Sequence, residues 1–585
     1  MAAIGPQVTR RRRAPWFVAP LAVVVLCTIA YMAVLPYIPS DEPAVQPSPD
    51  RPALVAGGIR HAAPAVVADG RLLLPVEALH DLVDPHIVWD ETARAVIVTT
   101  RDRVVKMRTG DLTAYVNGRP VSLSIAPVMM DDRPYAPAEP FSRLLGLSVH
   151  HDPESHVVVI DPPGSQSATG ETTVDTAIRT SPSVKAPVIS ELKQGSEVYL
   201  FGEMHGWYLA RQKSGLPGYV AKAAVVLKGV THAPQPPAPD YYRPWKRTGE
   251  RINLTWEHVL NKNPAPSSIG PLPGVNVVAP TWLKVADGSG SVTCRADPAY
   301  VKWAHSRGCE VWALVDNGFD PNRTRAFLSD PAARENIVRS LLLYAEMYDF
   351  DGINVDFENV FKEDAGLLVQ FIRELVPLAH EQGLAVSIDV TVKSSSGNWS
   401  LCYDRKALGS AADYLMLMAY DEYPAGSQTP GPTASLPWVE KGIRSLLEDV
   451  PPSKVVLGVP FYTRLWKQPG PAAAPGRLAP DATPAAPGAS NGEAARVTQR
   501  AVSMDEAAAI IRDRQLQPSW DAEAQQFVVR YEENGHRYVM WIEDEQSIRR
   551  RVALVKKFGL KGVASWRRGF ENAATWDALA ELRLF

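Results

Sequence analysis

The sequence predicts an α/β protein in which two small β-rich domains and an N-terminal transmembrane helix precede a C-terminal (β/α)8 TIM barrel with a small α+β insertion. Three observations support this prediction. Segments typical of strands and of helices alternate from about residue 250 to residue 585. Short β-rich runs separated by turn residues fill much of residues 57–228. An uncharged apolar run covers residues 16–38, and about 20 such residues span a bilayer.

The apolar run Trp16–Ile38 follows four consecutive arginines, Arg10–Arg13. Positive charge beside a membrane span stays in the cytoplasm. Residues 1–15 are therefore predicted to be a cytoplasmic tail, residues 16–38 a single-pass anchor in the cell membrane, and the remainder extracytoplasmic. The alternative is a signal peptide whose cleavage would release a secreted protein. No clear small-x-small cleavage site follows the run, which favours the uncleaved anchor.

Residues 57–162 contain an internal repeat, because Arg71–Leu79 recurs as Arg133–Phe141 and each copy leads on to a β-rich run. The pattern resembles the stalk module called copper amine oxidase N-terminal-like, which implies a spacer or a wall-binding module. The name implies no copper here, since the repeats lack a spaced histidine cluster. We predict no metal and no cofactor for this chain.

Residues 172–228 combine short β runs with turns, and Trp207–Tyr208 and Gly218–Val220 resemble segments of a bacterial SH3-like domain. Such domains often bind cell-wall peptides. The alternative, in which Trp207 and Tyr219 are simply the core of a small barrel, is equally open. Three further segments are predicted to be linkers from their Pro, Ser, Gly or Thr content: residues 39–56, 163–171 and 229–249.

Residues 250–585 carry eight candidate strands, as a (β/α)8 barrel requires. The candidates are Arg251–Trp256, Val275–Val285, Cys309–Asn317, Phe350–Glu358, Leu384–Val390, Tyr414–Tyr420, Val455–Tyr462 and Gly562–Trp566. The helices between them show the expected end signals. Asp330 can cap a helix that begins with Pro331, and Gly383 is placed to end the next one.

The segment Phe350–Val360 carries the chemistry that we predict for the barrel. Read as a strand, it places Asn354, Asp356 and Glu358 on one face, because side chains alternate along a strand. Two carboxylates on one face oppose each other's ionisation, so one can keep a proton near neutral pH. The alternative is a half-exposed strand whose polar face meets water. The strand's place in a barrel, where catalytic residues gather at carboxyl ends, favours a site.

The same segment resembles the signature of glycoside hydrolase family 18, Asp-x-x-Asp-x-Asp-x-Glu. Here the signature is made by Asp351, Asn354, Asp356 and Glu358. Further matches end later predicted strands in the family's order: Met418-Ala-Tyr420-Asp421, Tyr462 and Trp566. The resemblance implies a glycosidase acting on a polysaccharide that contains N-acetylglucosamine, such as chitin or peptidoglycan. The net charge of −3 gives no indication of a nucleic-acid partner.

The resemblance also implies substrate-assisted hydrolysis, in which the sugar's own 2-acetamido oxygen attacks the anomeric carbon. Glu358 would be the general acid. Asp356 would orient the acetamide and stabilise its positive charge, and Tyr420 would donate a hydrogen bond to the acetamide oxygen. The residues expected to contact substrate are Asp421, Tyr462, Asn354, Asn317, and Trp566 as the apolar floor under the sugar ring.

Two departures from the family pattern narrow the resemblance. Asn354 stands where the signature has its second aspartate, and it is expected to hydrogen-bond Asp356 without repelling it. The Ser-x-Gly-Gly motif of the third strand is missing, and Ala313–Asn317 stands there instead. Both features resemble the spore-cortex-lytic N-acetylglucosaminidases, which act on peptidoglycan. Asn317 is expected to face the substrate.

An insertion at about residues 464–550 separates the seventh and eighth predicted strands. It begins with a Pro/Ala/Gly-rich loop, Pro469–Ala495, and continues with a hairpin that turns at Asn534-Gly535. The insertion resembles the one found before the last strand in many family 18 enzymes. It would form a wall beside a sugar-binding groove.

The predicted function is that of a membrane-anchored, extracytoplasmic glycoside hydrolase that cleaves β-1,4 bonds after N-acetylglucosamine in peptidoglycan. One alternative is a chitinase or chitooligosaccharide hydrolase. An alternative of another class is a lectin-like cell-wall protein whose barrel binds glycan without cleaving it. A third is a structural wall tether. The presence of Glu358 favours an enzyme, and the anchor with wall-type modules favours peptidoglycan.

Overall fold

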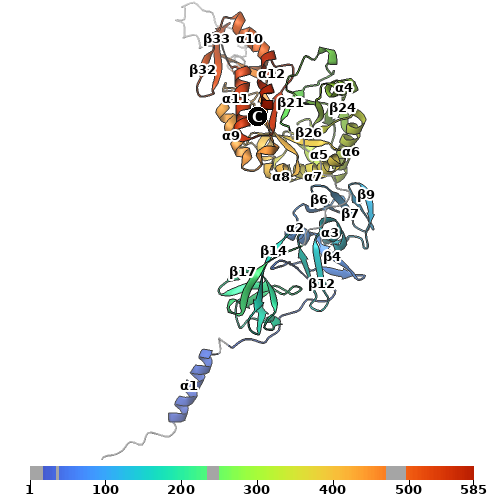
Figure 1. Ribbon diagram of the computed structural model, residues 1–585, viewed down its shortest axis with the longest axis vertical. Coiled ribbons are helices and arrows are strands. Elements are labelled where there is room, and N and C mark those ends of the chain that lie inside the picture. The colour runs from blue at the N-terminus through green and yellow to red at the C-terminus, as the bar shows by residue number, and fades with distance from the viewer. Residues whose placement is uncertain (1–17, 35–37, 234–249, 470–495, 585) are drawn as a thin grey trace, which may run out of the picture. The chain divides into compact units, whose positions relative to one another are not determined.

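The computed structural model describes residues 18–34, 38–233, 250–469 and 496–584 (Figure 1). The chain divides into two compact units. The first comprises residues 1–89, 107–114 and 121–238, and the second comprises residues 90–106, 115–120 and 239–585.

The helix α1, Val18–Val34, is the described part of the predicted anchor. It contains no charged residue. Among the described residues, no helix combines the length and the apolarity needed to cross a membrane. The predicted span also includes residues 16–17 and 35–37, which lie outside the described residues, as does the predicted tail of residues 1–15.

The internal repeat is a structural repeat. In each copy a strand leads directly into a short helix and then into a hairpin strand: β4 Arg71–Pro75, α2 Val76–Leu82 and β5 Ile87–Asp90 in the first, β11 Arg133–Pro137, α3 Ala138–Leu145 and β12 Ser148–Asp152 in the second. The two equivalent strands, β4 and β11, pair antiparallel with Tyr135 opposite Pro75. Leu73 and Tyr135 are buried in the small core that this pairing creates.

The second β-rich domain is one seven-stranded sheet in the order β16-β15-β19-β18-β17-β14-β20. Its strands are β14 Gln166–Thr172, β15 Thr176–Arg179, β16 Val188–Leu192, β17 Glu197–Met204, β18 Trp207–Arg211, β19 Gly218–Ala221 and β20 Val225–His232. The linker prediction for residues 163–171 is therefore wrong, as is the predicted linker start at 229. The extended, Thr-containing segment β14 pairs with both β17 and β20, which satisfies its backbone hydrogen bonds.

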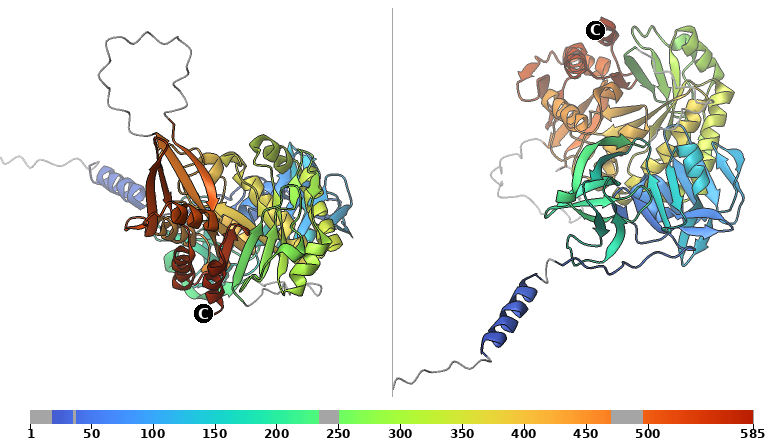
Figure 2. Two further views of the ribbon diagram at one scale, coloured as in Figure 1. Left: turned by 90° about the horizontal axis from the view of Figure 1, so that it is seen from above. Right: turned by 60° about the horizontal axis from the view of Figure 1, so that its bottom comes forward.

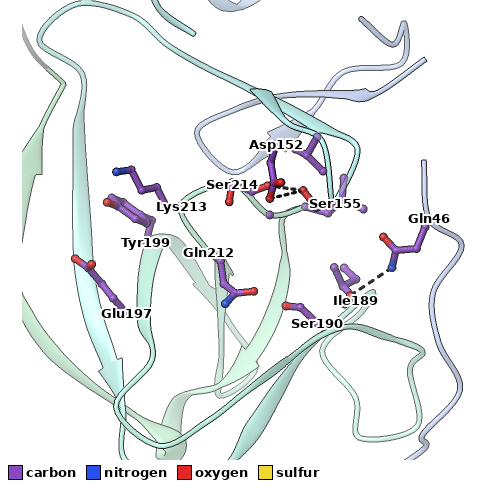
Figure 3. Close-up of a pocket in the computed structure, with 13 residues that line it drawn as sticks. Gln46, Asp152, Ser155, Ile189, Ser190, Glu197, Tyr199, Gln212, Lys213 and Ser214 are labelled. Atoms are coloured by element: carbon purple, nitrogen blue, oxygen red, sulfur yellow. Dashed lines mark hydrogen bonds between the residues drawn. The ribbon is translucent and has the colours of Figure 1, made fainter. Parts of the chain in front are cut away.

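The predicted linker of residues 39–56 is also partly wrong, because its first half lies along the edge of β16. The Ala44 N–H donates to the Val188 carbonyl (2.7 Å), and the Val188 N–H donates to Glu42 (2.7 Å). A cavity of about 400 Å³ opens beside this contact (Figure 3). There Ser155, from the turn between β12 and β13 Val157–Asp161, lies within hydrogen-bond distance of Asp152 and of the Ser214 carbonyl. Trp207 and Tyr219 are half-buried, which leaves both interpretations of them open.

The C-terminal domain is a closed ring of eight parallel strands, as the sequence predicts. The strands are β21 Ile252–Glu257, β22 Val277–Pro280, β25 Glu310–Asp316, β26 Gly352–Asp356, β27 Ala385–Thr391, β28 Tyr414–Met418, β29 Val455–Pro460 and β35 Gly562–Trp566. Each pairs in parallel with the next, and the pairing of β22 with β25 completes the ring. The predicted second strand divides in two: β22 ends at Pro280, and β23 Leu283–Val285 pairs in parallel with β25 and antiparallel with β24 Val292–Cys294.

Helices pack on the outside of this ring. They are α4 Pro298–Ser306, α5 Pro321–Ser329, α6 Pro331–Tyr348, α7 Ala365–Glu381, α8 Arg405–Ala411, α9 Leu436–Leu447, α11 Glu545–Phe558 and α12 Ala573–Ala580. The end signals act as predicted. The Asp330 side chain accepts the Ala332 N–H at the start of α6, and Gly383 follows α7 with φ of +77°.

Strand β26 is buried on both faces. Ile353, Val355 and Phe357 pack in the core between the strands and the helices, whereas Asn354 and Asp356 face the interior of the ring. Asn354 is 0% and Asp356 is 7% exposed. The alternative of a polar strand face that meets water is therefore wrong, because barrel closure covers that face.

The insertion forms a second sheet, in the order β31-β30-β34-β33-β32, which lies to one side of the barrel (Figure 2). Its elements are β30 Tyr462–Pro469, β31 Thr498–Ser503, α10 Met504–Asp513, β32 Ser519–Asp521, β33 Gln526–Glu533 and β34 His536–Trp541. The hairpin is confirmed, since Asn534 and Gly535 have φ of 50° and 71°, as a type I′ turn requires. Residues 470–495 of the predicted loop lie outside the described residues.

A buried ion pair joins the end of the insertion to α11. Arg551 donates to both carboxylate oxygens of Glu543, at 2.7 and 2.9 Å, and both side chains are at most 1% exposed. Gln526, on β33, donates to the same carboxylate at 2.9 Å. The pair therefore links the insertion's hairpin to the outer helices of the barrel.

Replacing Glu543 by Gln should destabilise the protein by about 3–5 kcal/mol, because it leaves the Arg551 charge buried without its counter-ion. Urea unfolding followed by tryptophan fluorescence measures this loss. Glu440→Gln is the control, since Glu440 pairs with the exposed side chains of Arg444 and Lys557 and its loss should cost below about 1 kcal/mol. Equal losses in the two variants would contradict the prediction.

Candidate active site

Glu358 lies in the loop that follows β26, not in the strand as predicted, because β26 ends at Asp356. Its backbone is held from both sides. The Asn317 side chain donates to the Glu358 carbonyl (2.7 Å) and accepts the Glu358 N–H (3.2 Å). The Tyr403 hydroxyl donates to the neighbouring Phe357 carbonyl (3.0 Å). These bonds fix the direction in which the Glu358 carboxyl leaves the strand end.

Asn317 is fully buried, and its remaining bonds go to Thr324 (2.8 Å) and to the Phe319 N–H (3.1 Å). Its side chain therefore positions the Glu358 backbone in this structure. The predicted contact with substrate stays a prediction, and the burial of Asn317 disfavours it.

Asn354 lies inside the ring, two residues before Asp356 on the same face of β26. Its amide nitrogen donates to the Asp389 carboxylate (2.8 Å) and to the Ser387 hydroxyl (3.1 Å), and its oxygen accepts the Trp256 indole N–H (2.8 Å). The predicted hydrogen bond from Asn354 to Asp356 is thus replaced by one to Asp389, on the neighbouring strand. Because Asn354 is 0% exposed, its predicted contact with substrate is disfavoured too.

The first aspartate of the signature, Asp351, serves the opposite end of β26. Its carboxylate accepts the Val311 N–H and lies against His305, both at 2.8 Å. Asp351 therefore anchors the start of the strand, away from Glu358.

Burial makes the carboxyl groups at the strand ends weak acids. It raises the pKa of Glu358 to about 7, with the nearby Asp421 charge as the second cause. Burial also raises the pKa of Asp356 well above its ordinary value, and the charges of Glu358 and Asp389 add to this shift. The pKa of Asp389 is raised for the same first reason. Glu358 can therefore hold a proton at neutral pH and release it to a substrate.

Tyr420 and Asp421 follow the end of β28. The Tyr420 ring lies edge-on to Tyr462, with centroids 6.3 Å apart. Burial raises the pKa of the Tyr420 hydroxyl well above 10, so this group remains a hydrogen-bond donor at neutral pH. Tyr462, which the structure places at the start of β30, donates to Asp421, and Arg464 donates to the same oxygen. Asp421 is thus held by the insertion while remaining 42% exposed.

Trp566 ends β35 as predicted and is half-buried. Its ring centroid lies 5.9 Å from that of Trp256 and 5.7 Å from that of His258, both in edge-on contacts. The indole below it, Trp256, is the group that binds Asn354. Trp566 therefore forms an apolar surface directly above the polar interior.

Four neighbours of this site have no counterpart in the sequence prediction: Asp389, Trp256, Tyr403 and Arg464. Asp389 had a detectable signal, because Ser387 and Asp389 alternate with apolar residues on a predicted strand just as Asn354 and Asp356 do. Trp256, Tyr403 and Arg464 had none, since they reach the site from segments distant in the sequence.

One group of residues in the first unit has metal-ligating atoms close together, namely His61, Glu77 and Asp81. These residues do not offer a ready ligand set. The His61 Nδ1 is engaged by the Ala63 backbone, at 3.1 Å from its N–H and 3.3 Å from its carbonyl, and Glu77 is paired with Arg133 (3.1 Å). We assign no metal to them.

Comparison with known families and proteins finds matches to both the barrel and the first β-rich domain. Residues 285–571 match the model of glycosyl hydrolases family 18, and residues 57–160 match that of the copper amine oxidase N-terminal domain. Three Bacillus subtilis proteins are similar. The "uncharacterized glycosylase YvbX" is 22% identical over 50% of this chain and 80% of its own length. The "putative sporulation-specific glycosylase YdhD" is 28% identical over 43% of this chain and 55% of its own length. The "cortical fragment-lytic enzyme" is 27% identical over 46% of this chain and 58% of its own length. This chain therefore spans little more than half the length of these two proteins.

Replacing Glu358 by Gln should stabilise the folded protein at pH 8 and leave its stability unchanged at pH 4. The folded-state pKa of about 7 exceeds the ordinary value of 4.5. The wild type therefore loses stability as pH rises from about 4.5 to about 7, by at most about 3 kcal/mol. Urea unfolding at the two pH values measures the difference.

The exposed Glu532, replaced by Gln, is the matched control and should show no such dependence on pH. A Glu358→Gln protein with the same advantage at pH 4 as at pH 8 would show that the Glu358 carboxyl titrates like a surface group.

Proposed function

We propose that this protein, a glycoside hydrolase by virtue of its family 18 domain, hydrolyses the β-1,4 bond that follows N-acetylglucosamine in peptidoglycan. The observation that carries the proposal is the Glu358 carboxyl. It lies at the carboxyl end of a barrel strand, and burial raises its pKa to about 7. A proton held there at neutral pH is what the departing glycosidic oxygen needs.

The second half of the reaction is assigned to the substrate itself. The other carboxyl of the signature, Asp356, is 7% exposed and faces the interior of the ring. A carboxyl group buried in this way is better placed to stabilise a positive charge on the bound substrate than to act as a nucleophile. A 2-acetamido oxygen would attack the anomeric carbon, and Asp356 would orient that acetamide and balance its positive charge, as in other substrate-assisted enzymes of this family.

Tyr420, Asp421 and Trp566 complete the proposed site. The Tyr420 hydroxyl, which stays protonated, would donate to the acetamide oxygen. Asp421, held by Tyr462 and Arg464, keeps an exposed oxygen for the sugar. Trp566 offers an apolar face to the ring at the cleaved bond.

Two features support peptidoglycan over chitin. Relatives named for cortical fragment lysis and for sporulation are among the most similar proteins. The chain also carries two β-rich domains ahead of the barrel, and from the segments Trp207–Tyr208 and Gly218–Val220 we infer that the second is an SH3-like wall-binding module. We propose that both domains hold the barrel within the wall.

We also propose that the N-terminal segment anchors the protein in the cell membrane with the barrel outside. The support is the uncharged run Trp16–Ile38 behind Arg10–Arg13. Deleting residues 1–38 should move the protein from the membrane fraction, after a carbonate wash, to the supernatant. Full-length expression that yields a supernatant protein from which the N-terminal segment has been cleaved would establish the secreted alternative.

Digestion of purified peptidoglycan and, separately, of chitin oligomers tests the function, with full-length protein in detergent and product masses read by mass spectrometry. New reducing ends at N-acetylglucosamine are expected from peptidoglycan. They should be absent with Glu358→Gln and present with the control Glu532→Gln. Cleavage of chitin oligomers alone would establish the chitinase alternative. Glycan bound without any product would establish a lectin-like protein.

Activity should fall as pH rises through about 7, where Glu358 loses its proton. Asp421→Asn should move this alkaline limit to lower pH, because the Asp421 charge helps to raise the pKa of Glu358. The rate at saturating substrate, measured between pH 5 and 9, checks both statements. If the alkaline limit of Asp421→Asn equals that of the wild type, the Asp421 charge does not raise the pKa of Glu358.

A further inference from the structure

We propose that Asp389, which lies outside the family signature, shares one proton with Asp356 and positions it for the reaction, while Asn354 holds Asp389 in place. The role in the reaction rests on the proposed function. The pairing itself rests on the geometry of the barrel interior.

The two carboxylates leave adjacent parallel strands at the same level. Val355 on β26 lies opposite Ile388 on β27, so the next residues along, Asp356 and Asp389, are neighbours across the ladder. Both side chains are buried, at 7% and 2% exposure. They face the same interior, because Asn354, on the Asp356 face of β26, bonds both Ser387 and Asp389.

The orientation of the Asn354 amide is determined by Trp256. An indole N–H can only donate, so the oxygen of Asn354 faces Trp256 and its NH₂ group faces Ser387 and Asp389. Asp389 is therefore the acceptor of this bond. An aspartate at position 354 would set a second carboxylate against it, which explains in physical terms why an amide suits this position when residue 389 is acidic.

Two buried carboxylates at neighbouring positions of adjacent strands cannot both be charged at low cost. The bond from Asn354 favours the charge on Asp389, whereas the Asp356 Oδ1 is buried without a hydrogen-bond partner within the described part of the chain. The shared proton therefore rests on Asp356 in the free protein.

Binding of the substrate would move the shared proton from Asp356 to Asp389. An acetamide N–H beside Asp356 gives that carboxylate a donor, so its O–H bond breaks and an O–H bond forms on the Asp389 Oδ2, the oxygen to which Asn354 does not donate. The total charge of the pair stays at −1. Asp356 then carries the negative charge beneath the positive charge that develops on the substrate, and Asp389 acts through Asp356 as a positioning residue.

Asp316 is the other candidate partner, because it lies opposite Asp356 on β25. Its surroundings differ from those of Asp389. The Gly318 N–H donates to its carboxylate (2.7 Å), and Lys284 lies 3.9 Å from it. Burial raises the pKa of Asp316, and these two neighbours act against that rise, whereas Asp356 has no such neighbours among the causes of its shift. The ionisable groups that act on Asp356 or are acted on by it are Glu358, Asp389, Asp316, Tyr403 and Tyr420.

Isotope-edited infrared spectra of the full-length protein, with ¹³C-labelled aspartate carboxyls, test the pairing without any substrate. At pH 7.5 the wild type should show a protonated-carboxyl band that is lost in Asp356→Asn and also in Asp389→Asn. The matched variant Asp316→Asn should retain it. A band that persists in Asp389→Asn, or that Asp316→Asn abolishes, would overturn the proposal. Thermal melting of each variant verifies folding.

Kinetics on the cleaved glycan test the role. Asp389→Asn should lower kcat by about tenfold to a hundredfold and leave KM within about threefold. The exchange Asn354→Asp with Asp389→Asn restores one donor and one acceptor, and should recover kcat to within about fivefold of the wild type. A double variant no better than Asp389→Asn would overturn the positioning role. A wild type that cleaves neither glycan would instead refute the proposed function and leave the infrared result standing.

Discussion

The exclusion of water from the carboxyl end of the barrel is the constraint on which this protein's chemistry depends. Closure of the ring through β22 and β25 covers the polar face of β26. Once the interior is covered, a carboxylate that faces it or lies at the strand ends becomes costly to ionise, and the pKa values of Asp356, Glu358 and Asp389 all rise with burial as the first cause. An open sheet with the same residues would leave them as ordinary surface acids.

Hydrogen bonds from neighbouring residues fix the orientation of the residues at this site. Asn317 and Tyr403 hold the backbone on either side of the Phe357–Glu358 bond, so the acid leaves the strand end at a set angle. Trp256 and Asp389 hold Asn354 in the same manner inside the ring. Arg464 and Tyr462, both from the insertion, hold Asp421 at the rim. The residues of the site are thus held by uncharged hydrogen-bond donors and by one guanidinium group, that of Arg464.

Two kinds of strand pairing hold the domains ahead of the barrel together. One joins equivalent strands of the repeat, and the other joins segments that are distant in the sequence. The two copies of the internal repeat meet at β4 and β11. The segment after α1 pairs with the edge of β16, which blunts an otherwise open sheet edge. Arg211, 2% exposed, reaches from β18 to Asp161 (3.1 Å) and to the Gly57 carbonyl (2.8 Å). The contacts of Arg211 thus join the two β-rich domains to each other.

The sequence by itself determined the eight strands, the helix ends at Asp330 and Gly383, the hairpin turn at Asn534-Gly535, and the glycoside hydrolase class, because each depends on a local pattern or on a short motif. Only the tertiary structure decided that residues 166–172 are a strand, that Asn317 lies beneath Glu358, and that Asn354 bonds Asp389 in place of Asp356. Those facts depend on which strands become neighbours when the ring closes. Alternation along one strand tells which face a side chain takes, and it carries no information about the side chains that meet it across the ladder.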